Sequence, residues 1–213
     1  TPDSESIHGN NSKRDYDVFA LTVNYQTRLG LIKSISSHQN YFNEFSMDRD
    51  ATAVNLYDTF DTSSTKTITQ EFNWSFDYGN SNWIFGTFFM DDETNRKTLF
   101  DLPLPIFGFP VPGKLEWDHK AIDTLSKAIF IDATFDLDQK TEISMGLRRT
   151  RDEFTSIQLN RVFLDLGQFI PVSTTCDRSI EQNFESDTSR FVIKRALDER
   201  FNAYFSYSEG FKA

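Results

Sequence analysis

The sequence predicts an all-β chain: a portion of an antiparallel transmembrane β-barrel, with about eight strands, short turns on one side and long loops on the other. Three observations favour this fold. Apolar and polar residues alternate along several segments, and the connections between these segments are alternately short and long. The net charge lies in the long connections. Together these features are typical of strands with one face in lipid and loops in water.

The predicted strands form four consecutive pairs, each joined by a short connection. Arg28–Gly30 joins the first pair, and the Gly/Asn turn signal Tyr78–Ser81 joins the second. Asp138–Lys140 joins the third pair, and Asp198-Glu199 joins the fourth. The paired strands are Asp17–Thr27 with Leu29–Tyr41, Thr67–Asp77 with Asn82–Met90, Ser126–Leu137 with Thr141–Arg151, and Arg190–Leu197 with Arg200–Ser208.

Within most of these strands the apolar period is two residues. On one strand Ile129, Ile131, Ala133, Phe135 and Leu137 share a face, while Ala128, Phe130, Asp132, Thr134 and Asp136 share the other. Such alternation gives each strand one apolar and one polar face. The strands Leu29–Tyr41 and Asn82–Met90 alternate less cleanly, so their sequence leaves open which side faces which way.

Three long connections separate the pairs: Phe42–Lys66, Asp91–Asp123 and Asp152–Ser189. Phe42–Lys66, Asp91–Ile122 and Asp152–Thr188 carry net charges of -3, -2 and -5, which account for the whole net charge of -10. Short turns at one end and long, acidic loops at the other are the layout of an outer-membrane barrel. Aromatic residues flank the short turns, and we expect them to form a girdle at headgroup depth; they are Tyr25, Phe76, Tyr78, Trp83, Phe135 and Phe201.

The composition argues against other classes of protein. A chain that binds nucleic acid meets the phosphates with a surplus of Lys and Arg, which this acidic chain lacks. No stretch approaches the roughly 20 apolar residues of a membrane-spanning helix. Thr1–Asp15 is polar and lacks the apolar region of a signal peptide, so the start of an exported product is expected outside this sequence. Cys176 is the single cysteine and indicates no compartment.

Three segments resemble the barrel of TonB-dependent outer-membrane receptors. Ala128–Glu153 is similar to a hairpin of that family, with Phe135-Asp-Leu137 before the turn and Gly146-Leu-Arg148 after it. Ala203–Ala213 resembles the family's strand end Tyr-Ser-x-Gly-Phe-Lys. Thr69–Ser75 followed by Trp83–Phe89 is a weaker likeness. Arg149 departs from the family, which usually has an aromatic residue there.

The resemblance implies a bacterial outer-membrane receptor with a barrel of about 22 strands and a plugged lumen. It implies uptake of scarce substrates, most often ferric siderophores, energised through the TonB complex, with membrane lipid around the barrel. Residues 1–15 would then be the remnant of an extracellular loop, and 16–213 part of the barrel domain. The plug that contacts TonB and the remaining strands would lie outside this sequence.

Few residues suggest chemistry beyond transport. His8, His38 and His119 have no ligand-spaced partners, and Glu116, Asp118 and His119 are an ordinary cluster in an acidic loop. No phosphate loop or nucleophile elbow is present, so we expect neither an enzyme nor a resident cofactor. Leu99–Gly113 holds four of the six prolines and cannot be a central strand; it is a loop that packs against neighbouring loops or contacts ligand.

The candidate ligand-contacting residues are the polar residues expected on the lumen side: Asp132, Glu142, Arg148 and Tyr204. A polar inner face is general in barrels, so their identity adds little. Two alternative functions remain. One is a complete small eight-stranded outer-membrane barrel with a structural or adhesion role, whose last strand pairs with its first. The other is a soluble β-sandwich binding module, whose apolar faces pack against each other.

Overall fold

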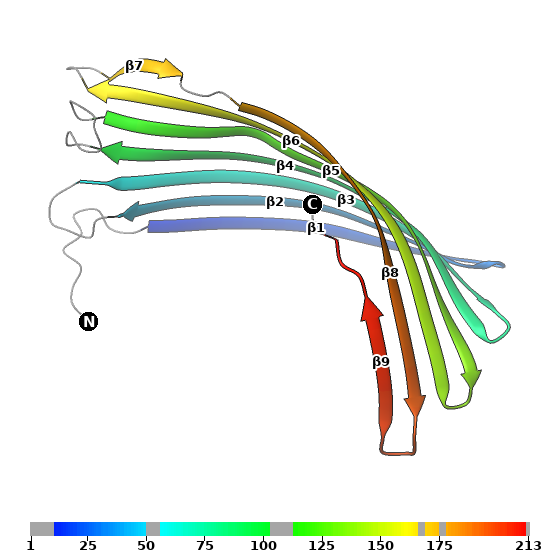
Figure 1. Cartoon of the computed structure of the whole chain (residues 1–213). Coiled ribbons are helices and arrows are strands. Elements are labelled where there is room, and N and C mark those ends of the chain that lie inside the picture. The colour runs from blue at the N-terminus through cyan, green and yellow to red at the C-terminus, as the bar shows by residue number, and fades with distance from the viewer. Residues whose placement is uncertain (1–10, 50–55, 103–112, 166–168, 175–177, 212–213) are drawn as a thin grey trace.

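The computed structural model describes residues 11–49, 56–102, 113–165, 169–174 and 178–211, and these residues form one antiparallel sheet (Figure 1). Within them no helix is long and apolar enough to cross a membrane. The strands are β1 (Asn11–Thr27), β2 (Gly30–Asp48), β3 (Asp58–Tyr78), β4 (Ser81–Leu102), β5 (Gly113–Asp138), β6 (Thr141–Asp165), β7 (Phe169–Thr174), β8 (Arg178–Ala196) and β9 (Asn202–Ser208).

The strands lie side by side in chain order, β1-β2-β3-β4-β5-β6-β8-β9. The short β7 pairs with β6 and lies off this path. The sheet is long, curved and open, with the tight hairpin turns at one end and the other connections at the opposite end (Figure 1). The eight strands of the main path and the asymmetry of the sheet's two ends confirm the predicted fold class.

The tight turns lie where the sequence predicted them. Tyr78 pairs with Ser81 across a turn in which Gly79 has a φ of 59°, a left-handed conformation that residues with a Cβ rarely adopt. Thr27 pairs with Gly30 across the first turn. Gly30 has a φ of 124°, and a Cβ at this position would lie 2.2 Å from the carbonyl oxygen of Ser75 on β3.

The strands are much longer than predicted, so the three long loops are the main error of the sequence analysis. β2 and β3 extend through most of Phe42–Lys66, and β4 and β5 take in both ends of Asp91–Asp123. β6 runs to Asp165 and β8 starts at Arg178, inside the predicted loop Asp152–Ser189. β1 starts at Asn11, so residues 11–15 are strand, while 1–10 lie outside the described residues.

The sequence did not predict these extensions because their apolar residues do not alternate with polar ones. A ladder of backbone hydrogen bonds needs no apolar side chains, and the extensions pair through residues such as Thr62 with Lys97 and Ser63 with Arg96. Register shifts between Thr94 and Arg96, and between Lys120 and Asp123, break the alternation further. In the proline-rich segment β4 ends at Leu102 and β5 begins at Gly113; residues 103–112 lie outside the described residues.

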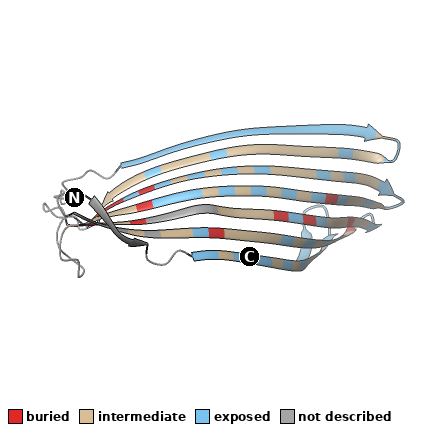
Figure 2. Ribbon diagram, turned by 90° about the horizontal axis from the view of Figure 1, so that it is seen from above, coloured by how far each residue is buried: buried red, intermediate tan, exposed pale blue. Residues whose placement is uncertain are grey.

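The described sheet is a single layer, and most of its surface is exposed or half-buried (Figure 2). Among the described residues the buried apolar side chains are Ala128 and Ala133. A β-sandwich needs a second layer packed on the first, so the sandwich alternative is wrong for this part of the chain. A barrel closed on itself also needs its first and last strands to pair, whereas β1 and β9 form opposite edges of the described sheet.

Candidate functional site

The register gives the sheet an apolar face and a polar face. Cross-strand partners share a face, and successive residues of a strand point to opposite faces. One row of partners runs through Ile32, Trp74, Phe85, Ile131 and Leu147, and is apolar from β2 to β6. The adjacent row on the opposite face runs through Lys33, Asn73, Gly86, Phe130 and Arg148. The facing left open for Leu29–Tyr41 and Asn82–Met90 follows, because Ile32 and Phe85 lie on the apolar face.

Aromatic rings gather on the apolar face beside the short turns. Trp74 and Phe76 of β3 have ring centroids 4.7 Å apart, and Phe85 of β4 lies 6.0 Å from each. Trp83 of β4 continues the group, with its ring 6.4 Å from Phe85 and 5.5 Å from Phe135 of β5. Phe76, Trp83 and Phe135 are three of the predicted girdle residues. The cluster forms one end of an apolar band on this face.

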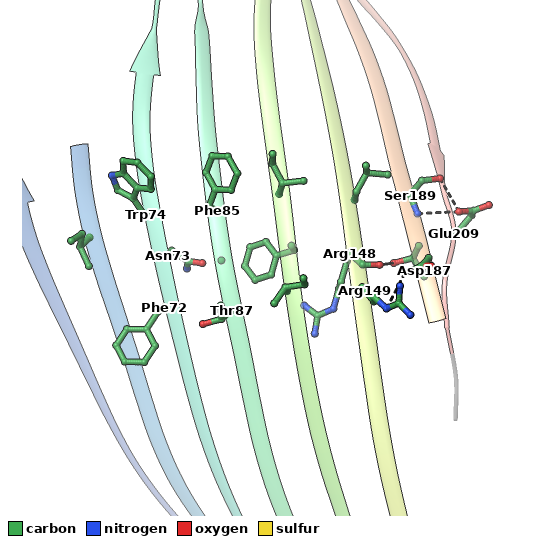
Figure 3. A pocket seen from close by; sticks show the side chains of 17 residues that line it. Phe72, Asn73, Trp74, Phe85, Thr87, Arg148, Arg149, Asp187, Ser189 and Glu209 are labelled. Atoms are coloured by element: carbon green, nitrogen blue, oxygen red, sulfur yellow. Dashed lines mark hydrogen bonds and ion pairs between the residues drawn. The ribbon is translucent and has the colours of Figure 1, made fainter. Parts of the chain in front are cut away.

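The apolar band contains a hollow of about 900 Å³ (Figure 3). Trp74 and Phe85 lie at one level of its lining and Phe72 and Thr87 at the next, on neighbouring strands. At its edge, Glu209 accepts hydrogen bonds from the backbone N and Oγ of Ser189, at 3.0 and 2.7 Å. Most of the lining is apolar, so this surface suits hydrocarbon chains rather than a charged ligand.

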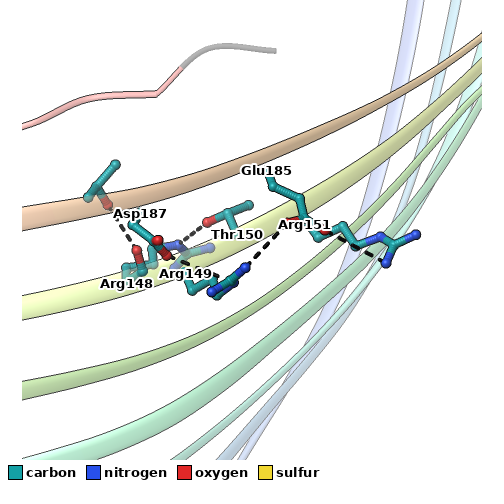
Figure 4. A network of polar contacts seen from close by, with 7 residues as sticks. Arg148, Arg149, Thr150, Arg151, Glu185 and Asp187 are labelled. Carbon is teal, nitrogen blue, oxygen red and sulfur yellow. Dashed lines mark hydrogen bonds and ion pairs between the residues drawn. The ribbon is translucent and has the colours of Figure 1, made fainter.

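Charged residues follow the apolar band on β6 and β8 (Figure 4). Arg149 lies 3.3 Å from Glu185 and 3.9 Å from Asp187, both on β8. Arg151 lies 3.2 Å from Glu153 and 3.8 Å from Glu185. Arg149 and Arg151 share the face of Leu147, so this network marks where that face changes from apolar to charged. The acidic partners on β8 also give Arg149, the departure from the family pattern, a structural role.

On the polar face, the predicted residue Asp132 forms an ion pair with Arg190. Nη2 of Arg190 lies 2.9 Å from Oδ1 and 2.8 Å from Oδ2 of Asp132. Asp132 is on β5 and Arg190 on β8, with β6 between them. The link is possible because Gly146 of β6 is the register partner of both residues and has no side chain in the way.

Arg148 lies one row from this ion pair and contacts two aromatic rings. Its guanidinium carbon is 5.4 Å from the ring centroid of Phe88 and 5.7 Å from that of Phe130. Its Nε donates a hydrogen bond to Oγ1 of Thr150 at 3.0 Å. A cation held over aromatic rings is stabilised by their quadrupoles. Arg148 is therefore fixed in place on the polar face.

The other two predicted residues, Glu142 and Tyr204, lie near the short turns. Glu142 pairs with Lys194, which pairs with Tyr204, so both are on the same polar face as Asp132 and Arg148. Tyr204 is 77% exposed. All four predicted residues thus share a face, but they lie in three different rows, with Glu142 and Tyr204 in the same one, and they do not form one site.

A second cavity lies on the polar face, toward the other end of the strands, and the sequence did not predict it. We call it the arginine cavity. Its volume is about 530 Å³, and it is lined by Arg14, Asn43, Phe45, Arg49, Thr59, Asp61, Arg96, Thr98 and Phe100. These residues come from β1 to β4 and from the residue after β2, and all fall in the N-terminal segment or the predicted loops. Only their register brings them together, so no local motif indicated the cavity.

Of the residues considered for a metal, the structure describes the side chains of His38 and Glu116, while those of Asp118 and His119 lie outside the described residues. Among the described residues no group of three or more His, Cys, Asp and Glu side chains could hold an ion. Glu116 is buried, with its carboxylate 2.6 Å from Nζ of Lys97 and 3.4 Å from Nη1 of Arg161. Two cations therefore occupy the carboxylate that would have been a ligand. His8 lies outside the described residues.

Comparisons with known proteins agree with this geometry. A family model described as "TonB dependent receptor-like, beta-barrel" matches residues 1–213. Among solved structures, the ferric yersiniabactin uptake receptor FyuA from Yersinia pestis matches with a TM-score of 0.68 at 15% sequence identity. The match covers 91% of this chain and 27% of the receptor chain, and at this identity it shows the fold alone. No curated protein matches this chain.

Proposed function

This chain belongs to the family of TonB-dependent receptor β-barrels, and we propose that it forms part of the wall of a bacterial outer-membrane receptor that takes up ferric siderophores. The observation that carries the proposal is the match of the family model over residues 1–213. The receptor is a transporter, so the chain binds and passes its ligand without a reaction and without a cofactor of its own.

The two faces of the sheet support a position in the membrane. The apolar face, with its aromatic cluster beside the turns and its hollow, would meet lipid chains and headgroups. The polar face would line the lumen, where Asp132, Glu142, Arg148 and Tyr204 could contact the plug or the passing ligand. The charged strand extensions beyond the apolar band would stand in water on the cell's outer side.

Energy for transport would come from the inner membrane through TonB. In this proposal TonB contacts the plug, which lies outside this sequence, so no residue of this chain is assigned to that contact. The choice of a ferric siderophore is supported by the structural neighbour, which is a ferric yersiniabactin uptake receptor. The open barrel edges at β1 and β9 would pair with further strands of the same receptor.

The test is iron uptake by cells that lack the complete receptor gene. Under iron limitation we expect the deletion to abolish uptake of radioactive iron from at least one ferric siderophore, and the complete gene on a plasmid to restore it. Deletion of tonB should abolish the same uptake in cells that carry the receptor. Normal uptake of every ferric siderophore offered to the deletion strain would refute the substrate, and uptake that persists without TonB would refute the energy source.

A further inference from the structure

The arginine cavity has a charge opposite to that of the chain. The chain as a whole carries -10, yet the cavity is lined by three arginines and one acid, Asp61. Arg14, Asn43, Ser63 and Arg96 form one row of register partners, and Phe45, Asp61 and Thr98 form the next row on the same face. Asn43 and Phe45 share the face of Lys33 on β2, so both rows lie on the polar face. A local surplus of cations in an acidic strand region is unexpected from composition alone.

The single acid of the cavity is already occupied. Arg96 donates to Oδ2 of Asp61 from Nε and Nη2, at 2.9 and 2.7 Å, and Oγ1 of Thr98 donates to the same oxygen at 2.7 Å. Asp61 is buried, with a side chain 11% exposed. It therefore neutralises Arg96 and has little capacity left for the other two arginines.

Arg14 and Arg49 have neutral partners in the described part of the chain. Nε of Arg14 lies 3.3 Å from Oδ1 of Asn43, and Nε of Arg49 lies 3.2 Å from Oγ1 of Thr59. These bonds orient each guanidinium and use its Nε, which leaves the terminal Nη donors to form the paired contacts that arginine makes with oxyanions. Both residues line one cavity.

We propose that the arginine cavity is the subsite that binds an anionic, aromatic oxygen-donor group of the ferric ligand. Arg14 and Arg49 supply the positive charge. Phe45, which lines the same cavity, supplies an aromatic face for a ring of the ligand. The cavity therefore selects anionic catecholate-type chelates over neutral hydroxamate chelates. This inference rests on the proposed function and adds the ligand's charge and the residues that recognise it.

The experiment measures binding to the purified, complete receptor in detergent. The probes are an iron(III) tris-catecholate complex, which is anionic, and an iron(III) tris-hydroxamate complex, which is neutral. The test variant is Arg14→Gln with Arg49→Gln. The matched control is Lys13→Gln, which removes a cation next to Arg14 but on the opposite face of β1, where Lys13 pairs with Asp15. Gel mobility with and without heating checks that each variant is folded.

We expect the double variant to bind the catecholate complex about ten- to hundredfold more weakly, as the loss of charge-assisted hydrogen bonds predicts. Its affinity for the hydroxamate complex should stay the same, and Lys13→Gln should match the wild type with both probes. Binding of the catecholate complex should also weaken as salt is raised. Equal affinity of the wild type and the double variant for the catecholate complex, or a wild type that prefers the hydroxamate complex or binds neither, overturns the inference.

The same double variant separates this inference from the proposed function. In cells, failure of the inference alone leaves receptor-dependent iron uptake intact and equal in the wild type and the double variant. Failure of the proposed function is detected in the deletion strain, which then takes up iron normally without the receptor gene. That result refutes both the proposed function and this inference.

Discussion

Arg190 of β8 holds Asp132 of β5 across the intervening strand β6, with Nη2 at 2.9 and 2.8 Å from the two carboxylate oxygens. Gly146 lies between them, and a Cβ there would come within 2.6 Å of Oδ2 of Asp132. The ion pair therefore joins two strands that are not neighbours, and the absence of a side chain at position 146 is what permits it. This relationship fixes three strands on the polar face.

A double-mutant cycle should detect this ion pair. The side chains of Arg190 and Asp132 are 49% and 27% exposed, so solvent weakens their attraction. We therefore expect a coupling energy of about 0.5 kcal/mol. The variants are Asp132→Asn, Arg190→Gln and both together, and the measurement is the free energy of unfolding of the complete receptor in detergent. In a Gly146→Ala background the coupling should vanish. Coupling that survives this substitution contradicts the geometry.

Replacing Gly86 by a residue with a side chain should destabilise the receptor more than the same replacement of an exposed glycine. A Cβ at Gly86 of β4 would lie 2.0 Å from Cζ of Phe130 on β5, so the ring must move away. We expect Gly86→Ala to lower the free energy of unfolding by about 1–3 kcal/mol, the usual cost of overpacking. The measurement is chemical unfolding of the complete receptor.

Two further variants check the cause of that cost. Gly86→Ala combined with Phe130→Ala should be less destabilised than the sum of the single variants, because the smaller side chain makes room. Gly210→Ala is the control, since a Cβ there would meet nothing within 4 Å. If Gly86→Ala is as stable as Gly210→Ala, the contact between Gly86 and Phe130 is not formed in the receptor.

The half of the sheet that carries the apolar band could be predicted because its signals are local. Alternation of Ile129 and Ile131 with Phe130 and Asp132 fixes the two faces of a strand. The glycine at position 79 meets the left-handed conformation that the turn requires. Where alternation failed, as in β2, the reason is visible: Ser34 and Ser36 follow Ile32 on the apolar face, so the pattern carries no information there.

The strand extensions and the arginine cavity could not be predicted because their signals are not local. Thr62 and Lys97 pair through backbone hydrogen bonds, which any side chain allows. Arg14 and Arg96 lie far apart in the sequence and line one cavity only because the register of β1 to β4 is continuous. Asp132, Glu142, Arg148 and Tyr204 lie on one face of the sheet, which alternation alone determines, and their contact with a ligand stays a prediction.

The turn between β5 and β6 should become less stable in acid. Oδ1 of Asp138 accepts a hydrogen bond from the backbone N of Lys140 at 2.7 Å, and this bond, with help from Thr141, lowers the pKa of Asp138 from its ordinary 3.8. A lowered pKa in the folded state adds stability above the unfolded pKa, and this stability is lost as pH falls through the folded value. Asp138 is fully exposed, so the effect is small.

Asp138→Asn isolates this effect, because the amide oxygen can still accept the bond while the charge is gone. Thermal unfolding of the complete receptor should show the wild type more stable than Asp138→Asn at pH 7. The difference should shrink as the pH falls below about 4. A difference that stays constant from pH 7 to pH 3 would show that the charge of Asp138 plays no part.

A pair of arginine substitutions on β6 tests which face of the sheet meets lipid. Leu147 lies in the apolar row and is 62% exposed, whereas Ser144 lies on the polar face, where its hydroxyl is 3.0 Å from that of Thr134. An arginine that faces the middle of the bilayer costs about 2–4 kcal/mol, while one in a polar lumen costs little. We therefore expect Leu147→Arg to reduce the amount of folded receptor in the outer membrane strongly, and Ser144→Arg to reduce it little.

The amount of folded receptor is measured by the heat-dependent gel shift of membrane fractions. Because both substitutions place the same charge on the same strand, a stronger defect in Ser144→Arg would reverse the assignment of the two faces, and with it the position of the arginine cavity in the lumen.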